Sequence, residues 1–285
     1  MTIGDTLKRN KWRYLSLVAG FFLFVGPFVL LGRGVNLLIG SIAEPTIHTF
    51  CYRMPVAAIF GGGLPTILGS VAGIFVVGVV GTSFFLGPAF CGWLCPVGGI
   101  SEGVSRAVPL PDRFRLRLKD PAVTRGLRYG FFAGFVTVAV LIGYKLATIG
   151  SLTCKFCTPG VLQNIASGLT GDITAITYWH TGSILTLFSW LLIGGVFMSG
   201  GRGMCLFFCP LGALSSITHT VGKKLGMYRV SFNKDKCADC KQCKVSCPTW
   251  AIGQDRAPDS ALCNTCRECT TACPMGSYEY RKGGA

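Results

Sequence analysis

Charged residues are scarce in this sequence: they make up 14 % of the 285 residues, and only 12 residues are acidic. A soluble domain carries about 25 % charged residues, so much of this chain is expected to lie in lipid. All 12 acidic residues fall outside the four apolar runs described below, which argues against a carboxylate proton relay through a bilayer. The sequence also lacks a glycine-rich nucleotide loop after a strand, a Gly-x-Ser-x-Gly motif and paired carboxylates. The kinds of chemistry that depend on these motifs are therefore not expected.

Uncharged apolar runs take up much of the chain, in which half of the residues are hydrophobic and the mean hydropathy is +0.52. A helix needs roughly 20 residues to cross the hydrocarbon core of a bilayer. Residues 54–63 contain a glycine triplet and are expected to form a short or re-entrant piece. The first run is expected to be an uncleaved span, because it is long for a signal peptide and no Ala-x-Ala site follows it. The four predicted transmembrane helices are Tyr14–Gly32, Leu64–Phe85, Tyr129–Ile149 and Ser183–Met198.

The basic residues are unevenly distributed along the chain. Of the 27 lysines and arginines, 23 lie in residues 1–13, 102–128 and 202–285, and the other four fall on the opposite side of the predicted helices. Cytoplasmic segments of membrane proteins carry such an excess of positive charge. We therefore expect a multi-pass protein of the bacterial inner membrane with both termini in the cytoplasm. This topology, with contact to anionic lipid, accounts for the net charge of +15, and no nucleic-acid partner is expected.

Eight of the 15 cysteines form two runs near the end of the sequence, each followed by proline. Thiolates at this spacing hold iron–sulfur clusters, and in bacterial two-cluster ferredoxins the fourth cysteine of each run binds the other cluster. Zinc hooks instead pair two Cys-x2-Cys motifs across a longer loop, and disulfides would not require this pattern. We assign one [4Fe–4S] cluster to Cys237, Cys240, Cys243 and Cys273, and a second to Cys263, Cys266, Cys269 and Cys247.

Four further cysteines belong to a motif that occurs at the ends of the second and fourth predicted helices. One copy reads Cys91-Gly-Trp-Leu-Cys95-Pro-Val-Gly, and the other reads Cys205-Leu-Phe-Phe-Cys209-Pro-Leu-Gly. On a helix, positions i and i+4 share a face, so each copy is expected to offer two thiolates. We predict that these four cysteines hold one shared cluster or tetrahedral metal at the cytoplasmic end of the bundle. The alternative is that they only pack between helices.

This combination of motifs resembles the NapH-type membrane subunit, the ferredoxin-type component of the quinol dehydrogenase that serves periplasmic nitrate reductase. It is also similar to the membrane polyferredoxin part of the nitrous-oxide reductase regulator. The resemblance covers residues 14–275. It implies a protein that exchanges electrons with membrane quinol and passes them to a redox partner.

Three cysteines on the predicted outer side do not belong to that resemblance: Cys51, Cys154 and Cys157. In an oxidising compartment, Cys154 and Cys157 can form a disulfide. The other interpretation is an outer redox centre held by all three thiolates, with His48 or His180 as a fourth ligand. The residues leave both interpretations open.

The sequence therefore predicts an all-α membrane protein with a small C-terminal domain. Residues 1–225 are expected to form four transmembrane helices arranged as two repeated hairpins, and residues 226–285 a cytoplasmic α+β bacterial ferredoxin domain with two [4Fe–4S] clusters. The predicted function is electron exchange between the quinol/quinone pool and redox partner proteins in a multi-subunit complex. The alternatives are a transmembrane electron-transfer subunit without a quinone site of its own and a membrane redox sensor.

Overall fold

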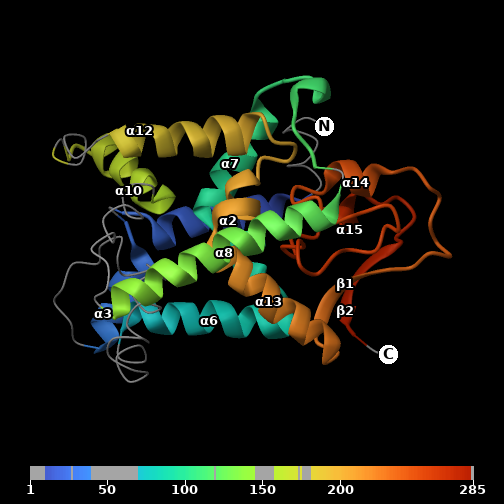
Figure 1. The fold of residues 1–285 in the computed structure, drawn as a ribbon, viewed down its shortest axis with the longest axis horizontal. Helices are drawn as coiled ribbons and strands as arrows, with labels where there is room; N and C mark the ends of the chain where they lie inside the picture. The colour runs from blue at the N-terminus through green and yellow to red at the C-terminus, as the bar shows by residue number, and fades with distance from the viewer. Residues whose placement is uncertain are drawn as a thin grey trace.

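The computed structural model describes residues 10–26, 28–39, 70–118, 120–144, 157–172, 174 and 181–283. These residues are largely helical, and the cysteine-rich C-terminal segment packs at one end of the helices (Figure 1). The helical part contains α2 (Lys11–Phe24), α3 (Leu30–Ile39), α6 (Val71–Leu86), α7 (Pro96–Ala107), α8 (Pro121–Gly143), α10 (Thr158–Leu169), α12 (Thr181–Leu187) and α13 (Pro210–Lys224). Its shorter segments are the π-helices η2 (Phe90–Leu94), η4 (Phe188–Val196) and η5 (Met204–Phe208) and the 3-10 turn η3 (Asp112–Phe114).

The C-terminal segment contains one small sheet and two short helices. Strands β1 (Tyr228–Phe232) and β2 (Tyr278–Lys282) pair antiparallel, with Tyr228 opposite Lys282. Helices α14 (Gln242–Ser246) and α15 (Glu268–Ala272) each follow a cysteine loop. The two strands bring the ends of the segment together, and the two cysteine runs lie between them.

The predicted membrane spans are only partly reflected in the helices. Among the described residues, α8 alone is long and apolar enough to cross a membrane, while α6 and residues 182–196 form shorter apolar helices. The arrangement of four spans therefore stays a prediction.

The expected first span is divided in the structure. We expected one helix over Tyr14–Gly32, but α2 ends at Phe24 and α3 begins at Leu30. The sequence between them contains Gly26 followed by proline, which has no N–H and disfavours helical backbone in the residue before it. Val29 adopts a left-handed conformation with φ of 41°, and the chain turns there.

Close backbone contacts fix the helices against one another. The α-carbon of Gly222 in α13 lies so close to the carbonyl of Phe84 in α6 that an added Cβ would come within 3.0 Å of it. Gly20 in α2 meets the carbonyl of Leu94 in the same way. These glycines hold α2 against η2 and α13 against α6 because only hydrogen separates the backbones.

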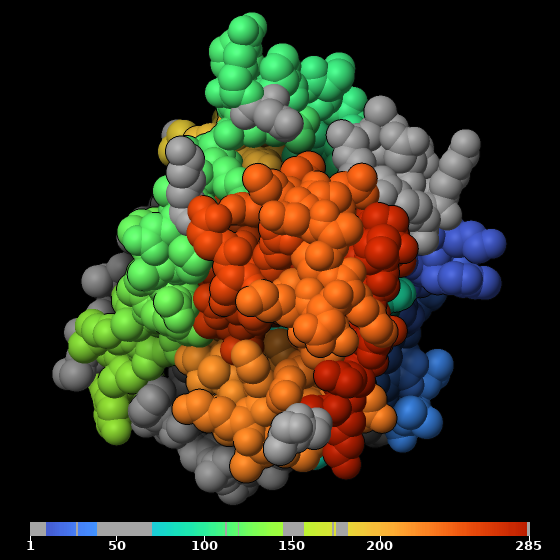
Figure 2. Space-filling model, turned by 90° about the vertical axis from the view of Figure 1, so that its right-hand side faces the viewer, coloured from blue at the N-terminus to red at the C-terminus, as the bar shows by residue number. Residues whose placement is uncertain are grey.

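The C-terminal segment occupies the centre of the face seen in Figure 2, and it packs against the helices through an apolar core. Leu206 and Phe207 of η5 share a hydrophobic core with Trp250 and with two of the ferredoxin cysteines, Cys243 and Cys247. The Trp250 indole N–H donates to the carbonyl of Ser199 at 2.7 Å. The two cysteine runs are thereby positioned directly beside the repeated motifs of the helical part.

Candidate metal centres

The two Cys-x3-Cys-Pro motifs have the same local structure. Cys91 and Cys205 lie within the π-helical turns η2 and η5. The N–H of Cys95 donates to the carbonyl of Phe90 at 2.9 Å, and that of Cys209 donates to the carbonyl of Met204 at 3.0 Å. Both second cysteines then leave the helical region, with ψ of 112° and 109°.

Proline explains this geometry. The residue before a proline avoids the α conformation, and proline itself is suited to the first position of a new helix. Pro96 begins α7 and Pro210 begins α13. We expected both cysteines of each motif on one continuous helix, but the structure places them at a junction between two helices.

The two junctions bring their four cysteines into one electrostatic neighbourhood. Cys91 interacts with Cys95, Cys205 and Cys209. Burial raises the pKa of Cys95 to about 12 and that of Cys209 to about 11, and neighbouring cysteines add to both shifts. Four thiolates here would repel one another unless a cationic centre bound them, and a bound metal deprotonates a coordinating thiol.

Two helix N-termini face this group of cysteines. The N–H of Gly212 in the first turn of α13 donates to the Cys209 sulfur at 3.4 Å. The N–H of Gly98 in the first turn of α7 bonds to Cys95 in the same way. Helix N-termini carry partial positive charge and favour thiolates, so both repeats supply the same stabilisation.

Two buried arginines, Arg202 and Arg128, flank the site and were not predicted as part of it. Arg202 donates to the carbonyl of Cys91 at 2.7 Å, and Arg128 donates to the carbonyl of Gly212 at 2.5 Å. An added Cβ on Gly98 would lie under 3.0 Å from Arg202, and one on Gly212 would lie 3.1 Å from Arg128. The glycine of each motif thus makes room for one arginine. The sequence indicates only a topology role for Arg128. Its position near the start of a predicted span is the one signal for a role beside the motif cysteines.

We predict that Gly98→Ala destabilises the protein, whereas Gly103→Ala on the same helix does not. The new methyl group at Gly98 would displace Arg202, and overpacking of this kind costs about 1–3 kcal/mol. Nothing lies within 4 Å of the position that a Cβ would take on Gly103, and alanine favours a helix over glycine by about 1 kcal/mol. Thermal unfolding of the purified variants measures both effects. Equal melting temperatures would contradict this account of the motif glycine.

A buried ionic network joins the motif to the C-terminal segment. Glu102 of α7 is fully buried and pairs with Arg13 at 2.6 Å, Arg202 at 2.8 Å and Arg106 at 2.7 Å. Arg13 also pairs with the buried Glu268 of α15 at 2.6 Å and donates to the carbonyl next to Cys91, that of Gly92, at 2.9 Å. Sequence analysis treated these arginines as topology signals and missed the network.

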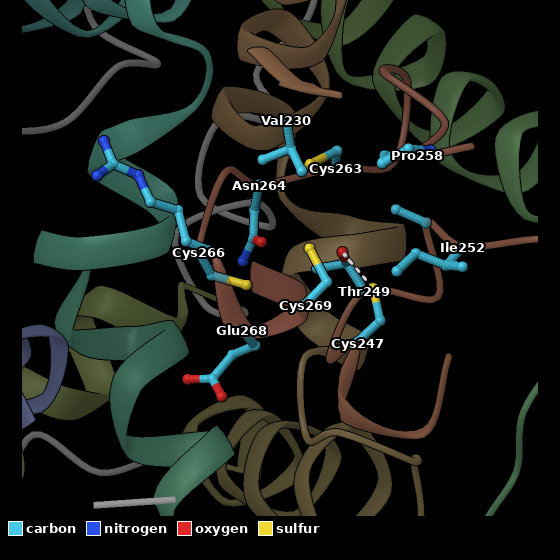
Figure 3. A pocket seen from close by; sticks show the side chains of 12 residues that line it. Val230, Cys247, Thr249, Ile252, Pro258, Cys263, Asn264, Cys266, Glu268 and Cys269 are labelled. Atoms are coloured by element: carbon cyan, nitrogen blue, oxygen red, sulfur yellow. Dashed lines mark hydrogen bonds between the residues drawn. The ribbon is translucent and has the colours of Figure 1, made fainter. Parts of the chain in front are cut away.

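Four ferredoxin cysteines line a single cavity: Cys247, Cys263, Cys266 and Cys269 (Figure 3). Each of the last three interacts electrostatically with Cys247. Burial raises the pKa of Cys263 and of Cys266 to about 12. This is the set assigned from the sequence to one cluster, with the fourth cysteine taken from the other run, and its four members line one cavity.

The other set is Cys237, Cys240, Cys243 and Cys273, of which Cys240 is exposed and Cys243 buried. Hydrogen-bond donors lie on three of its sulfurs. Arg256 donates to Cys237 at 2.8 Å, the Tyr278 hydroxyl donates to Cys243 at 3.3 Å, and the Ser277 N–H donates to Cys273 at 3.4 Å.

The two cysteine loops share an unusual backbone. In each, the residues on both sides of the second cysteine are left-handed and are not glycine: Asp239 and Lys241 in one, Thr265 and Arg267 in the other, with φ between 54° and 60°. Such conformations cost free energy and persist where the surroundings impose them, often at functional sites. The repeated strain fits two loops shaped around similar ligands.

The motif site and the cavity are in direct contact. An added Cβ on Gly92, next to Cys91, would lie 3.1 Å from the backbone nitrogen of Cys266. The Trp93 indole N–H donates to the carbonyl of Thr265 at 3.0 Å. The first repeat therefore packs its cysteine turn onto a ferredoxin loop with no intervening layer.

No group of three His, Cys, Asp or Glu side chains in the described ranges is arranged to hold a single metal ion. The predicted outer centre cannot be described, because Cys51, Cys154, His48 and His180 lie outside the described residues, as do residues 54–63. Cys157 is described and immediately precedes α10.

Each repeat of the chain matches a known domain family, and longer parts of the chain match several known proteins. Residues 68–117 and 183–228 each match the family model of a 4Fe-4S binding domain. YccM of Escherichia coli K12, provisionally named an electron transport protein, is 26 % identical over 198 residues, which are 66 % of this chain and 48 % of YccM. The ferredoxin-type protein MauN of Methylorubrum extorquens, named for methylamine utilization, is 25 % identical over 255 residues, or 85 % of this chain and 76 % of MauN.

An uncharacterized protein of Methanocaldococcus jannaschii is 25 % identical over 176 residues, which cover 61 % of this chain and 63 % of that protein. The matched region thus spans about half of YccM and less than two thirds of the archaeal protein. No solved structure matches the chain. The two matched segments contain the two Cys-x3-Cys-Pro motifs, so each repeat is similar to a 4Fe-4S binding domain.

Proposed function

We propose that this chain is a membrane-bound iron–sulfur protein that exchanges electrons between the quinol/quinone pool and a redox partner. The observation that carries the proposal is the contact between the cysteine-bearing segments. The turn that contains Cys91 packs through Gly92 directly against the loop of Cys266, and the two ferredoxin sets share one hydrophobic core. Iron–sulfur clusters accept and release single electrons, and adjacent clusters can pass them on.

The chain's own residues suit clusters better than single ions. The ferredoxin thiols Cys247, Cys263, Cys266 and Cys269 surround a common cavity, and the four motif cysteines interact with one another. Thiolates that bind the corners of a four-iron cube lie further apart than the ligands of one ion, which agrees with the lack of single-ion groups in the described part of the chain. We propose a [4Fe–4S] cluster for each ferredoxin set and a further iron–sulfur centre between the two motifs.

The surface of the helices supports the proposed place in the membrane. Exposed apolar patches of this extent usually face lipid or a partner. The 18-residue apolar window of α8 is only 11 % buried. Large apolar side chains are exposed along several helices: Trp12, Leu15, Val18, Leu37, Leu38, Ile74, Val77, Phe131, Phe188 and Ile193.

The names of the relatives and the resemblance support the electron-transfer role. YccM is named for electron transport and MauN is named ferredoxin-type. Quinol as the membrane reactant rests on the resemblance to the NapH-type subunit.

We expect Cys95→Ala/Cys209→Ala to lose about four of about twelve iron atoms per chain, because one of three four-iron centres loses two thiolates. Iron and acid-labile sulfide in the anaerobically purified protein measure the loss. The control is Ser101→Ala/Ser215→Ala, which changes two buried side chains six residues further along the same repeats and should keep all iron. Full iron content in the cysteine variant would leave those cysteines as packing residues and remove the motif centre.

A quinol analogue tests the membrane reactant. Added to the purified protein in detergent under anaerobic conditions, it is expected to reduce the clusters, as followed by EPR. Clusters that dithionite reduces but the quinol does not would favour a subunit that receives electrons only from protein partners.

A further inference from the structure

Side-chain donors are gathered on one of the two ferredoxin sets. The guanidinium of Arg256, from the loop between the two cysteine runs, lies 2.8 Å from the sulfur of Cys237. The hydroxyl of Tyr278, on β2, lies 3.3 Å from the sulfur of Cys243 and 2.8 Å from the carbonyl oxygen of Arg256, and its single proton is shared between these two acceptors. The tyrosine therefore both contacts a sulfur and holds the arginine loop in place.

The other set has a poorer supply of donors. In the part of the chain that the structure describes, the Thr265 N–H lies 3.4 Å from the sulfur of Cys263, and the Thr249 hydroxyl lies 3.9 Å from the sulfur of Cys247. Arg13 is the strongest charge acting on Cys266, and Glu268 and Glu102, which both form ion pairs with Arg13, oppose it. Arg267 also lines the cavity, but neither arginine is a hydrogen-bond donor to a sulfur of this set in the described residues. Glu268 lines the same cavity (Figure 3).

These surroundings favour reduction of the two clusters to different degrees. Reduction adds an electron to the cluster, and hydrogen bonds to the sulfurs, nearby positive charge and solvent exposure stabilise the more negative form. Asp239 pairs with Arg256 and offsets part of its charge, but this carboxylate is 70 % exposed and is screened by water. The direct bond from Arg256 to the sulfur is therefore the larger effect, and the exposed Cys240 adds to it.

We propose that Arg256 and Tyr278 are positioning residues that raise the reduction potential of the cluster held by Cys237, Cys240, Cys243 and Cys273 above that of its neighbour. This inference rests on the proposed function, because it requires both clusters. It places the first electron of the ferredoxin domain on the cluster that reaches the surface through Cys240.

The test is a dithionite titration of the full-length, anaerobically purified protein, followed by EPR. Tyr278→Phe removes one hydroxyl, and Arg256→Met removes the cationic donor. For Arg256→Met we expect about a tenfold fall in the ratio of reduced to oxidised cluster at the wild-type midpoint, or about 59 mV for one electron. Tyr278→Phe should shift the same cluster in the same direction, and the neighbouring cluster should keep its midpoint.

Matched controls lie on the same strand. The Tyr280 hydroxyl donates to the carbonyl of Leu86, and Arg281 donates to Ser231, so Tyr280→Phe and Arg281→Met should leave the midpoint of the cluster at Cys237 unchanged. Arg281→Met should also leave the neighbouring midpoint unchanged, whereas the Tyr280 ring contacts Arg267 beside that cavity. Two intact clusters whose midpoints do not move in Tyr278→Phe and Arg256→Met would overturn the inference and leave the proposed function standing. If Arg256→Met loses iron, Tyr278→Phe decides alone. A wild-type protein without iron would instead remove the proposed function itself.

Discussion

Glu102→Gln is expected to lower the free energy of unfolding by about 3–5 kcal/mol, because removal of one partner from a buried ionic group leaves uncompensated charge. Glu102 has no exposed surface, and its carboxylate accepts hydrogen bonds from Arg13, Arg106 and Arg202. Glutamine has nearly the same shape but no charge, so three guanidinium groups would share only Glu268 as a buried anion. Thermal or denaturant unfolding of the variant in detergent measures the effect.

The same carboxylate predicts a pH dependence. Burial opposes its ionisation, but the three arginines outweigh burial and hold the pKa of Glu102 well below its usual value of 4.5. As the pH falls below about 4.5, the unfolded chain takes up a proton there and the folded chain does not, so stability falls with pH in that range. Glu102→Gln should lose this part of the dependence.

Glu279 supplies the control for Glu102. It pairs with Lys236 at 3.2 Å, and both side chains are about half exposed. Exposed pairs contribute about 0–1 kcal/mol, so Glu279→Gln should unfold close to the wild type. If Glu102→Gln were as stable as Glu279→Gln, the network would not hold the helices and the C-terminal segment together.

The candidate metal ligands could be predicted from the sequence because cluster-binding cysteines are close together along the chain. The runs beginning at Cys237 and Cys263 and the motifs at Cys91 and Cys205 could be found without knowledge of the fold. The π-helical turns could not be predicted from this spacing. The i and i+4 argument assumes one regular helix, whereas the proline after each second cysteine ends the first helix and begins the next. Gly26 and the proline that follows it are a sequence signal for the division of the first predicted span. Hydropathy does not show this division, because the whole run is apolar.

The arginine network could not be predicted because its partners are distant in sequence. Arg13 and Glu268 are separated by 255 residues, and Arg202 and Glu102 by 100. Hydropathy and the distribution of positive charge give a basic residue near an apolar run the same interpretation whether it faces lipid, water or a buried carboxylate. Glu102 directly follows the uncharged stretch of residues 54–101. This position beside a long apolar stretch was the one sequence signal that the Glu102 carboxylate is buried.

An exchange of fourth cysteines between the two ferredoxin runs predicts which double variants lose one cluster and which lose two. Cys247 lines the cavity of Cys263, Cys266 and Cys269 although it ends the other run. If it binds their cluster, Cys247→Ala and Cys263→Ala damage the same four-iron centre. We then expect the double variant Cys247→Ala/Cys263→Ala to lose about four iron atoms, no more than either single variant, since the two changes act on one unit.

A second pair of changes separates this scheme from its rival. Cys247→Ala/Cys243→Ala removes one ligand from each cluster under the exchange and should lose about eight iron atoms. If each run instead held its own cluster, the losses would be reversed: about four atoms for the Cys243 pair and about eight for the Cys263 pair. Iron analysis of the two double variants, with melting temperatures to confirm that both remain folded, therefore decides which cysteines share a cluster. Because both variants contain Cys247→Ala and differ only in the second site, a general loss of stability from that change cannot produce the twofold difference.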